Sequence, residues 1–146
     1  MESDLRTLRK QAGLSQKQLS ELSGVAQSNI SAYESGRRTA SPAMLQRLSE
    51  AMIRPSERLR QHRHAAHAII TRLGGRNPRV FGSIARGTDT PKSDVDLLVS
   101  VPPEAAWGFL SLSRELEELL GVPVHVVSEG GLKDKHVAIL AEAIPL

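Results

Sequence analysis

The chain of 146 residues contains no cysteine and few aromatic residues. Without cysteine there is no disulfide, no thiolate zinc site and no cysteine nucleophile. Aromatic residues make up 3% of the chain, so the cores must be aliphatic, and nucleic-acid binding by stacking of bases on aromatic rings is not expected. No apolar run approaches the roughly 18 residues that span a membrane, and the polar first residues are unlike a signal peptide. We therefore expect a cytoplasmic protein that does not bind a membrane.

Positive charge is concentrated in the first part of the chain. Residues 1–60 carry ten Lys and Arg against six Asp and Glu, whereas residues 61–146 carry nine against ten. A basic module attracts polyanions, so a nucleic-acid partner would bind the first part. The sequence Ile-Arg-Pro at 53–55 follows the last helical pattern of the basic part. We therefore predict one domain over residues 1–54 and a second over residues 55–146.

The first domain has the signals of four short helices. Ser15 and Gln18 form a capping-box pattern that opens a helix with Leu19 and Leu22 as its inward residues, and a glycine ends it. Serine followed by proline at 41–42 begins the fourth helix. Two short helices joined by a tight glycine turn, inside a basic module, form the geometry that places one helix in the major groove of DNA.

The residues of this first domain resemble a known family. The stretches LSQKQL at 14–19 and QSNISAYESGR at 27–37 are similar to the Cro-like (XRE-type) helix-turn-helix repressors, over residues 3–52. The resemblance implies that Gln27, Ser28 and Ala32 face base edges. Gln27 can form two hydrogen bonds with an adenine, whereas Ala32 can make only an apolar contact with a thymine methyl group. It also implies a set of phosphate-binding residues, which are Gln16, Asn29, Arg37 and Arg38.

The same resemblance predicts the DNA partner and leaves one alternative open. One such module contacts few bases, so we expect a homodimer on an operator with two half-sites. The alternative is that polar residues at 27 and 28 only solvate an exposed helix.

The second domain alternates strands and helices. One helix is expected from residue 55 to the glycines at 74–75, because apolar residues recur there at helical spacing. Strands and further helices are then indicated by β-branched runs and by an apolar stripe that steps by four and three residues. The strands are expected at 79–81, 94–99 and 122–127, and the helices at 103–120 and 132–143. The chain is therefore predicted to be α+β, with a four-helix module followed by a small mixed sheet.

A chemical motif lies between the first two expected strands. Gly82 follows a strand and lets the backbone turn sharply, and Ser83 begins a helical turn whose free N–H groups attract anions. After ten further residues, Asp94 and Asp96 lie on one face of the next strand. Two adjacent carboxylates repel each other unless a hard cation lies between them, and Mg²⁺ takes one or two carboxylates together with substrate phosphates.

This motif resembles the minimal nucleotidyltransferase family of the polymerase-β superfamily, over about residues 62–146. The resemblance implies that Gly82 and Ser83 contact the nucleotide ATP, and that Asp94 and Asp96 are catalytic ligands of Mg²⁺. Arg86 is expected to bind phosphate, because a guanidinium meets two phosphate oxygens at once. Ser93, directly before the aspartate pair, is assigned to the nucleotide as well.

The chain departs from the family pattern on the third strand. Members of the family usually carry a third acidic residue there, whereas this chain reads Val-His-Val-Val at 124–127. Imidazole is a poor ligand of Mg²⁺, but His125 can accept a proton from the attacking hydroxyl, so we include it among the catalytic residues. The alternatives are that His125 only packs at the strand end, and that Glu129 replaces the missing acid.

The two resemblances together imply a DNA-binding antitoxin. Such a protein would bind a HEPN-type toxin as a hetero-oligomer, transfer AMP from ATP to it, and repress the shared operon. One rival is a non-catalytic repressor whose degenerate transferase fold senses a nucleotide or sequesters a toxin. A second is an antibiotic-modifying nucleotidyltransferase, which is disfavoured because no residues remain for a small-molecule acceptor domain.

Overall fold

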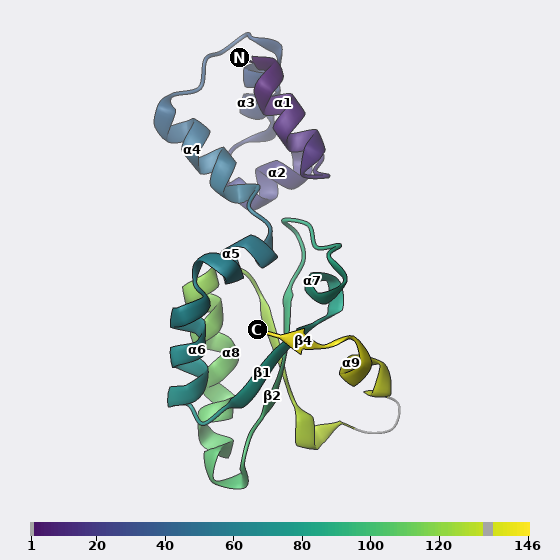
Figure 1. The fold of residues 1–146 in the computed structure, drawn as a ribbon. Helices are drawn as coiled ribbons and strands as arrows, with labels where there is room; N and C mark the ends of the chain where they lie inside the picture. The colour runs from purple at the N-terminus through teal and green to yellow at the C-terminus, as the bar shows by residue number, and fades with distance from the viewer. Residues whose placement is uncertain (1, 133–135) are drawn as a thin grey trace. The chain divides into compact units, whose positions relative to one another are not determined.

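The computed structural model describes residues 2–132 and 136–146 and divides into two compact units (Figure 1). The first, called here the N-terminal unit, comprises the residues up to Arg54 together with Thr90–Lys92. The second, called the sheet unit, comprises Pro55–Asp89 and Ser93–Leu146. No helix in the described ranges is long and apolar enough to cross a membrane.

The N-terminal unit consists of helices α1 (Glu2–Gln11), α2 (Gln16–Ser23), α3 (Gln27–Ser35) and α4 (Pro42–Ala51). The predicted capping box is confirmed: the Ser15 hydroxyl accepts the Gln18 N–H at 3.0 Å, and the Gln18 side chain accepts the Ser15 N–H at 2.9 Å. The Ser41 hydroxyl likewise accepts the Met44 N–H at the start of α4. Local side-chain caps therefore set where α2 and α4 begin.

The core of the N-terminal unit is aliphatic, as the composition predicts. It consists of Leu5, Leu14, Leu19, Val25, Ile30 and Leu48. The prediction that Leu22 faces inward is wrong, because Leu22 is 42% exposed. The inner side of α2 is formed by Leu19 and Ser23, which are four residues apart, and the Ser23 hydroxyl is satisfied there by the Leu19 carbonyl.

The sheet unit combines a four-stranded sheet with helices. Its elements are α5 (Pro55–Gln61), α6 (Arg63–Arg72), β1 (Arg76–Phe81), α7 (Gly82–Arg86), β2 (Val95–Ser100), the 3₁₀ turn η1 (Pro103–Ala105), α8 (Ala106–Leu120), β3 (Val124–Ser128), the 3₁₀ turn η2 (Glu129–Gly131), α9 (Val137–Glu142) and β4 (Ile144–Pro145). The strand order is β3-β2-β1-β4. Strand β2 is parallel to β3, and the other two pairs are antiparallel, so the predicted mixed sheet and α+β class are confirmed.

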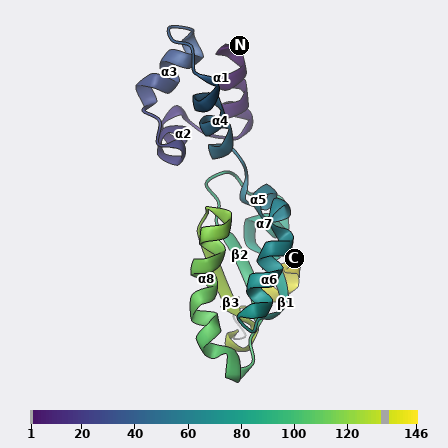
Figure 2. The same cartoon turned by 90° about the vertical axis from the view of Figure 1, so that its left-hand side faces the viewer.

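Helices α5, α6 and α8 cover one face of this sheet, while α7 and α9 lie on the other side (Figures 1 and 2). Because side chains alternate along a strand, every second residue of β2 enters the core between the sheet and the covering helices. The main members of this core are Ala66, Ile70, Val80, Val95, Leu97, Val99, Leu112, Leu116, Leu120 and Val124. Of the residues of β2 between these positions, Leu98 is also fully buried, whereas Asp96 is only partly buried and is available for a site.

Three elements differ from the sequence prediction. The helix expected from residue 55 to 74 is two helices, because the backbone of His62 leaves helical geometry at φ −111° and ψ 20°. The last helix, expected over 132–143, is described only as Val137–Glu142, and residues 133–135 of that prediction lie outside the described residues. The short strand β4 was not predicted, since two residues give no periodicity.

A buried ionic cluster joins α1, α2 and α3. The Glu34 carboxylate is fully buried and accepts two hydrogen bonds from Arg9, at 2.7 and 2.9 Å. Gln16 and Arg6 donate to the same carboxylate at 3.2 and 3.4 Å. Burial raises the pKa of Glu34, but the hydrogen bonds from Arg9 and Gln16 outweigh it and hold the pKa below its ordinary value. The cluster therefore fixes the mutual placement of three helices.

We expect Glu34→Ala to destabilise the N-terminal unit by about 3 to 5 kcal/mol, because it leaves the buried Arg9 guanidinium without its partner. Urea denaturation followed by circular dichroism measures the loss, and Glu21→Ala, at an exposed position of the same unit, should change stability by about 0.5 kcal/mol or less. Because the folded-state pKa of Glu34 is lowered, its contribution is complete above the ordinary glutamate pKa and is lost as the pH falls through the folded-state value. Equal losses for the two variants would contradict this role.

Candidate active site

Strand register brings the two halves of the motif together. Strands β1 and β2 are antiparallel, and Phe81, the last residue of β1, pairs with Asp96. On the other side of β2, His125 of β3 also pairs with Asp96. The ten residues between Ser83 and Asp94 form most of α7 and the loop that returns to β2. The Gly-Ser turn, the two aspartates and His125 therefore lie together at one end of the sheet, where β1 ends and β2 and β3 begin.

Gly82 lies closer to the Asp96 carboxylate than a residue with a side chain could. Its φ is +70°, a left-handed conformation that favours glycine. A Cβ atom on Gly82 would lie 2.3 Å from Asp96 Oδ2, so no side chain fits between the turn and the carboxylate. Both the backbone conformation and the space at this position require glycine.

The two aspartates converge on His125. His125 Nε2 lies 3.6 Å from Asp94 Oδ2, and His125 Nδ1 lies 3.6 Å from Asp96 Oδ1. Burial raises the pKa of Asp96 above its ordinary value, and the negative charges of Asp94 and Glu142 add to that effect, while His125 and Arg86 oppose it. A cation at this position would therefore be attracted by two carboxylates that repel each other.

The family resemblance implies Mg²⁺ at this site. Within residues 2–132 and 136–146, no group of three or more His, Asp or Glu side chains is arranged to hold a metal ion. Two carboxylates are nevertheless a sufficient protein contribution for Mg²⁺, which keeps waters and takes its other ligands from substrate phosphates. Asp94 and Asp96, which are partly exposed, fit that mode of binding.

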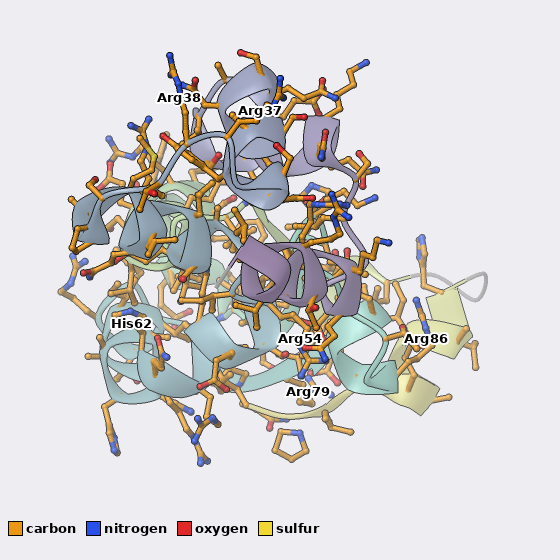
Figure 3. All side chains as sticks on the ribbon, turned by 90° about the horizontal axis from the view of Figure 1, so that it is seen from above. Arg37, Arg38, Arg54, His62, Arg79 and Arg86 are labelled. Carbon is orange, nitrogen blue, oxygen red and sulfur yellow. The ribbon has the colours of Figure 1, made fainter. Side chains whose placement is uncertain are left out.

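The residues assigned to phosphate binding are close together, but their donors already have a partner. The Gly82 N–H donates to Glu142 Oε1 at 2.7 Å, and Arg86 Nη1 lies 3.1 Å from Glu142 Oε2. Arg86, labelled in Figure 3, is thus paired with a carboxylate of α9. Ser83 and Ser93 are half-buried on either side of the loop between α7 and β2. Glu142 was missed from the sequence, because it lies sixty residues from Gly82 and belongs to no motif.

Glu129 does not replace the missing third acid. It follows β3, and the neighbouring pair Val99 and Ser128 lies three residues along the strands from Asp96 and His125, about 10 Å away. Its carboxylate instead accepts hydrogen bonds from Arg79 at 2.9 Å and from Ser100 at 2.5 Å. Glu129 therefore stabilises the far end of the sheet.

In the N-terminal unit, the helix α3 presents part of the predicted DNA-binding set. Gln27 and Ser28 are exposed, and Asn29 accepts a hydrogen bond from Arg38 at 3.1 Å. Arg37 and Arg38 are exposed after the end of α3 (Figure 3). The prediction for Ala32 is corrected, because Ala32 is 8% exposed and packs inside the unit.

Gln16 has a partner inside the unit, and its assignment to phosphate stays a prediction. Its side-chain amide donates to the buried Glu34 carboxylate at 3.2 Å, so a structural role competes with phosphate binding.

Comparison with known proteins identifies both units. Residues 69–146 match the family described as "Nucleotidyltransferase domain", and residues 5–59 match the family described as "Helix-turn-helix". A solved structure titled "Structure of putative minimal nucleotidyltransferase" is 43% identical, with a TM-score of 0.57, over 62% of this chain and 95% of that chain.

Two archaeal relatives are similar over a shorter segment. "Putative protein adenylyltransferase MJ0128" of Methanocaldococcus jannaschii is 37% identical over 59 residues, which are 40% of this chain and 60% of that protein. "Protein adenylyltransferase MntA" of Thermococcus cleftensis is 41% identical over 63 residues, which are 42% of this chain and 64% of that protein. The chain thus covers less than two thirds of the length of either relative.

Comparing the two glycines at the ends of α7 tests whether the contact between Gly82 and Asp96 constrains the site. Gly82 and Gly87 have φ of +70° and +72°, but nothing lies within 4 Å of a Cβ placed on Gly87. We expect Gly87→Ala to cost about 1 to 2 kcal/mol through its backbone conformation alone, and Gly82→Ala to cost more, because its methyl group meets Asp96. Urea denaturation of both variants measures the difference. Equal losses would show that the contact with Asp96 imposes no constraint.

Proposed function

The chain belongs to the nucleotidyltransferase domain family, and on that premise we propose that it transfers AMP from ATP to a hydroxyl group of a protein. The hydroxyl oxygen attacks the α-phosphorus, the bond to the β-phosphate breaks, and pyrophosphate leaves with its electron pair. The observation that carries the proposal is the meeting of the Gly82 turn with Asp94 and Asp96 at one end of the sheet.

Each residue of the site has a role in this proposal. The Gly82 N–H and the Arg86 guanidinium bind phosphate oxygens, and Ser83 and Ser93 contact the nucleotide. Asp94 and Asp96 hold Mg²⁺, which when bound offsets the negative charge that develops on the phosphates. His125, beside both carboxylates, receives the proton of the attacking hydroxyl.

We further propose that the acceptor is a HEPN-type toxin and that the chain acts as its antitoxin in the cytoplasm. The names of the two archaeal relatives support a protein acceptor for those proteins. In this chain, Trp107 and Leu110 of α8 are 83% and 70% exposed and line a depression of 370 Å³ with Pro102 and Phe109. An exposed apolar patch that includes aromatic side chains is typical of protein-binding surfaces.

The helix-turn-helix of the N-terminal unit extends the proposal to DNA. We propose that a homodimer binds the operator of its own gene and represses it. The net positive charge of residues 1–60 and the exposed Gln27 and Ser28 support this role.

A second candidate is a repressor that binds a nucleotide without turnover. Two observations favour it: His125 stands where the family usually has an acid, and Glu142 holds the donors proposed for phosphate. Catalysis separates the two candidates, because only the first leads to a covalent product.

We expect Asp94→Asn and Asp96→Asn each to lower AMP transfer by about 100-fold or more, because each removes negative charge that holds the metal beside the reacting phosphate. The assay supplies ATP labelled at the α-phosphate, Mg²⁺ and a lysate of the native host, and detects labelled protein. Glu118→Gln, at an exposed position of α8, should leave transfer unchanged. Transfer at the normal rate by both Asp variants would contradict the assignment of the metal ligands.

The DNA-binding proposal is tested on duplexes that the protein itself selects from a random pool. We expect Gln27→Ala to cost about 1 to 3 kcal/mol on the selected sequence and almost nothing on random DNA, because Gln27 is assigned to a base edge. Arg37→Ala should weaken binding to both DNAs alike and reduce the salt slope by about one, as loss of one phosphate contact requires. If both variants lose the same affinity on both DNAs, α3 does not read the sequence.

A further inference from the structure

The Glu142 carboxylate accepts hydrogen bonds from two donors that are proposed to bind phosphate, the Gly82 N–H and the Arg86 guanidinium. Glu142 Oε1 accepts the Gly82 N–H at 2.7 Å and lies 3.3 Å from Arg86 Nη1, while Glu142 Oε2 lies 3.1 Å from the same nitrogen. A backbone N–H and a guanidinium that converge on two oxygens of one anion are the donors that a phosphate group also uses. In the free protein, Glu142 therefore stands where the proposed function places a phosphate.

The charge state of Glu142 agrees with this arrangement. The hydrogen bond from Gly82 holds the pKa of Glu142 below its ordinary value against the opposing effect of desolvation, and Arg86 lowers it further. The carboxylate is thus ionised at neutral pH and competes as an anion.

Helix α9, which carries Glu142, contributes no buried residue to the core of the sheet unit. Helix α9 has six residues, Val137–Glu142, and none of them is buried. Val137 and Leu140 are 61% and 44% exposed. An element with so little buried apolar surface opens at low free-energy cost compared with the rest of the fold.

We propose that Glu142 competes with the nucleoside triphosphate for the phosphate site. Its carboxylate occupies the Gly82 N–H and the Arg86 guanidinium until α9 moves away from α7. This inference rests on the proposed function and adds a regulatory element to the same site. Nucleotide binding then requires the Gly82 N–H and Arg86 to exchange the carboxylate for a phosphate. A partner that holds α9 away from α7 would raise nucleotide affinity, because it would remove the competitor.

The first test is the affinity for ATP in the presence of Mg²⁺, measured by calorimetry on the full chain. We expect Glu142→Ala to bind about tenfold more tightly than wild type, because the competent state no longer has to be opened first. Glu142→Gln should give a smaller increase, since its amide oxygen still accepts the Gly82 N–H. The matched control is Glu115→Ala, which removes a carboxylate paired with Arg72 elsewhere in the sheet unit and should not change affinity.

The outcomes separate the inference from the proposed function. If wild type binds ATP and Glu142→Ala binds no more tightly, Glu142 is not a competitor, and the proposed function stands. If neither wild type nor Glu142→Ala binds ATP, both are overturned, because donors freed of Glu142 should hold a phosphate. Unfolding curves of each variant show whether a loss of binding reflects a loss of the fold.

The second test separates displacement from a simple change of charge near the site. The pKa of the Glu142 carboxyl group is measured by nuclear magnetic resonance on wild-type protein with labelled glutamate, and the signal is assigned by its absence from Glu142→Gln. We expect the pKa to lie below the ordinary glutamate value in the free protein and to rise to that value or above it when Mg²⁺ and ATP saturate the site. A pKa that stays low in the saturated protein would overturn the inference, because Glu142 would still hold its donors.

Discussion

The candidate site depends on the close approach of the Gly82 backbone to the Asp96 carboxylate. The pairing of Phe81 with Asp96 places the turn after β1 directly against β2, and only a residue without a Cβ atom fits there. This contact puts a backbone N–H, which attracts anions, beside carboxylates, which attract cations. A nucleotide and its metal ion are the ligands that combine both charges, so one steric constraint produces the chemical character of the site.

The same close approach places groups of like charge side by side in the free protein. Asp94 and Asp96 lie beside each other, and the neighbouring donors of Gly82 and Arg86 have no phosphate to bind. His125 lies between the two carboxylates, and Glu142 satisfies the two donors. The fold therefore balances its charges internally, at the cost of competition between Glu142 and any phosphate. Such a balance is consistent with a site whose activity depends on a partner.

The features that could be predicted from the sequence are those formed by residues close together in the chain. The capping box at Ser15 was predicted because its hydrogen bonds join residues three apart. The Gly82 turn and the two aspartates were predicted to form one motif because only ten residues separate Ser83 from Asp94, but the close contact of Gly82 with Asp96 was not predicted. Contacts across long separations could not be predicted: Glu142 reaches Gly82 across sixty residues. Burial of Ala32, and of Ser23 in place of Leu22, depends on how helices pack, which periodicity in a short helix does not determine.

The central claim is that this site directs attack on the α-phosphorus of ATP. Two parallel incubations with Mg²⁺ and native host lysate test it, one with ATP labelled at the α-phosphate and one with ATP labelled at the γ-phosphate. We expect the wild-type chain, but not Asp94→Asn, to add the α-label to a protein without adding the γ-label, which is recovered in pyrophosphate. Equal α-labelling of protein with wild type and with Asp94→Asn, or a γ-label that wild type but not Asp94→Asn adds to protein, would contradict it.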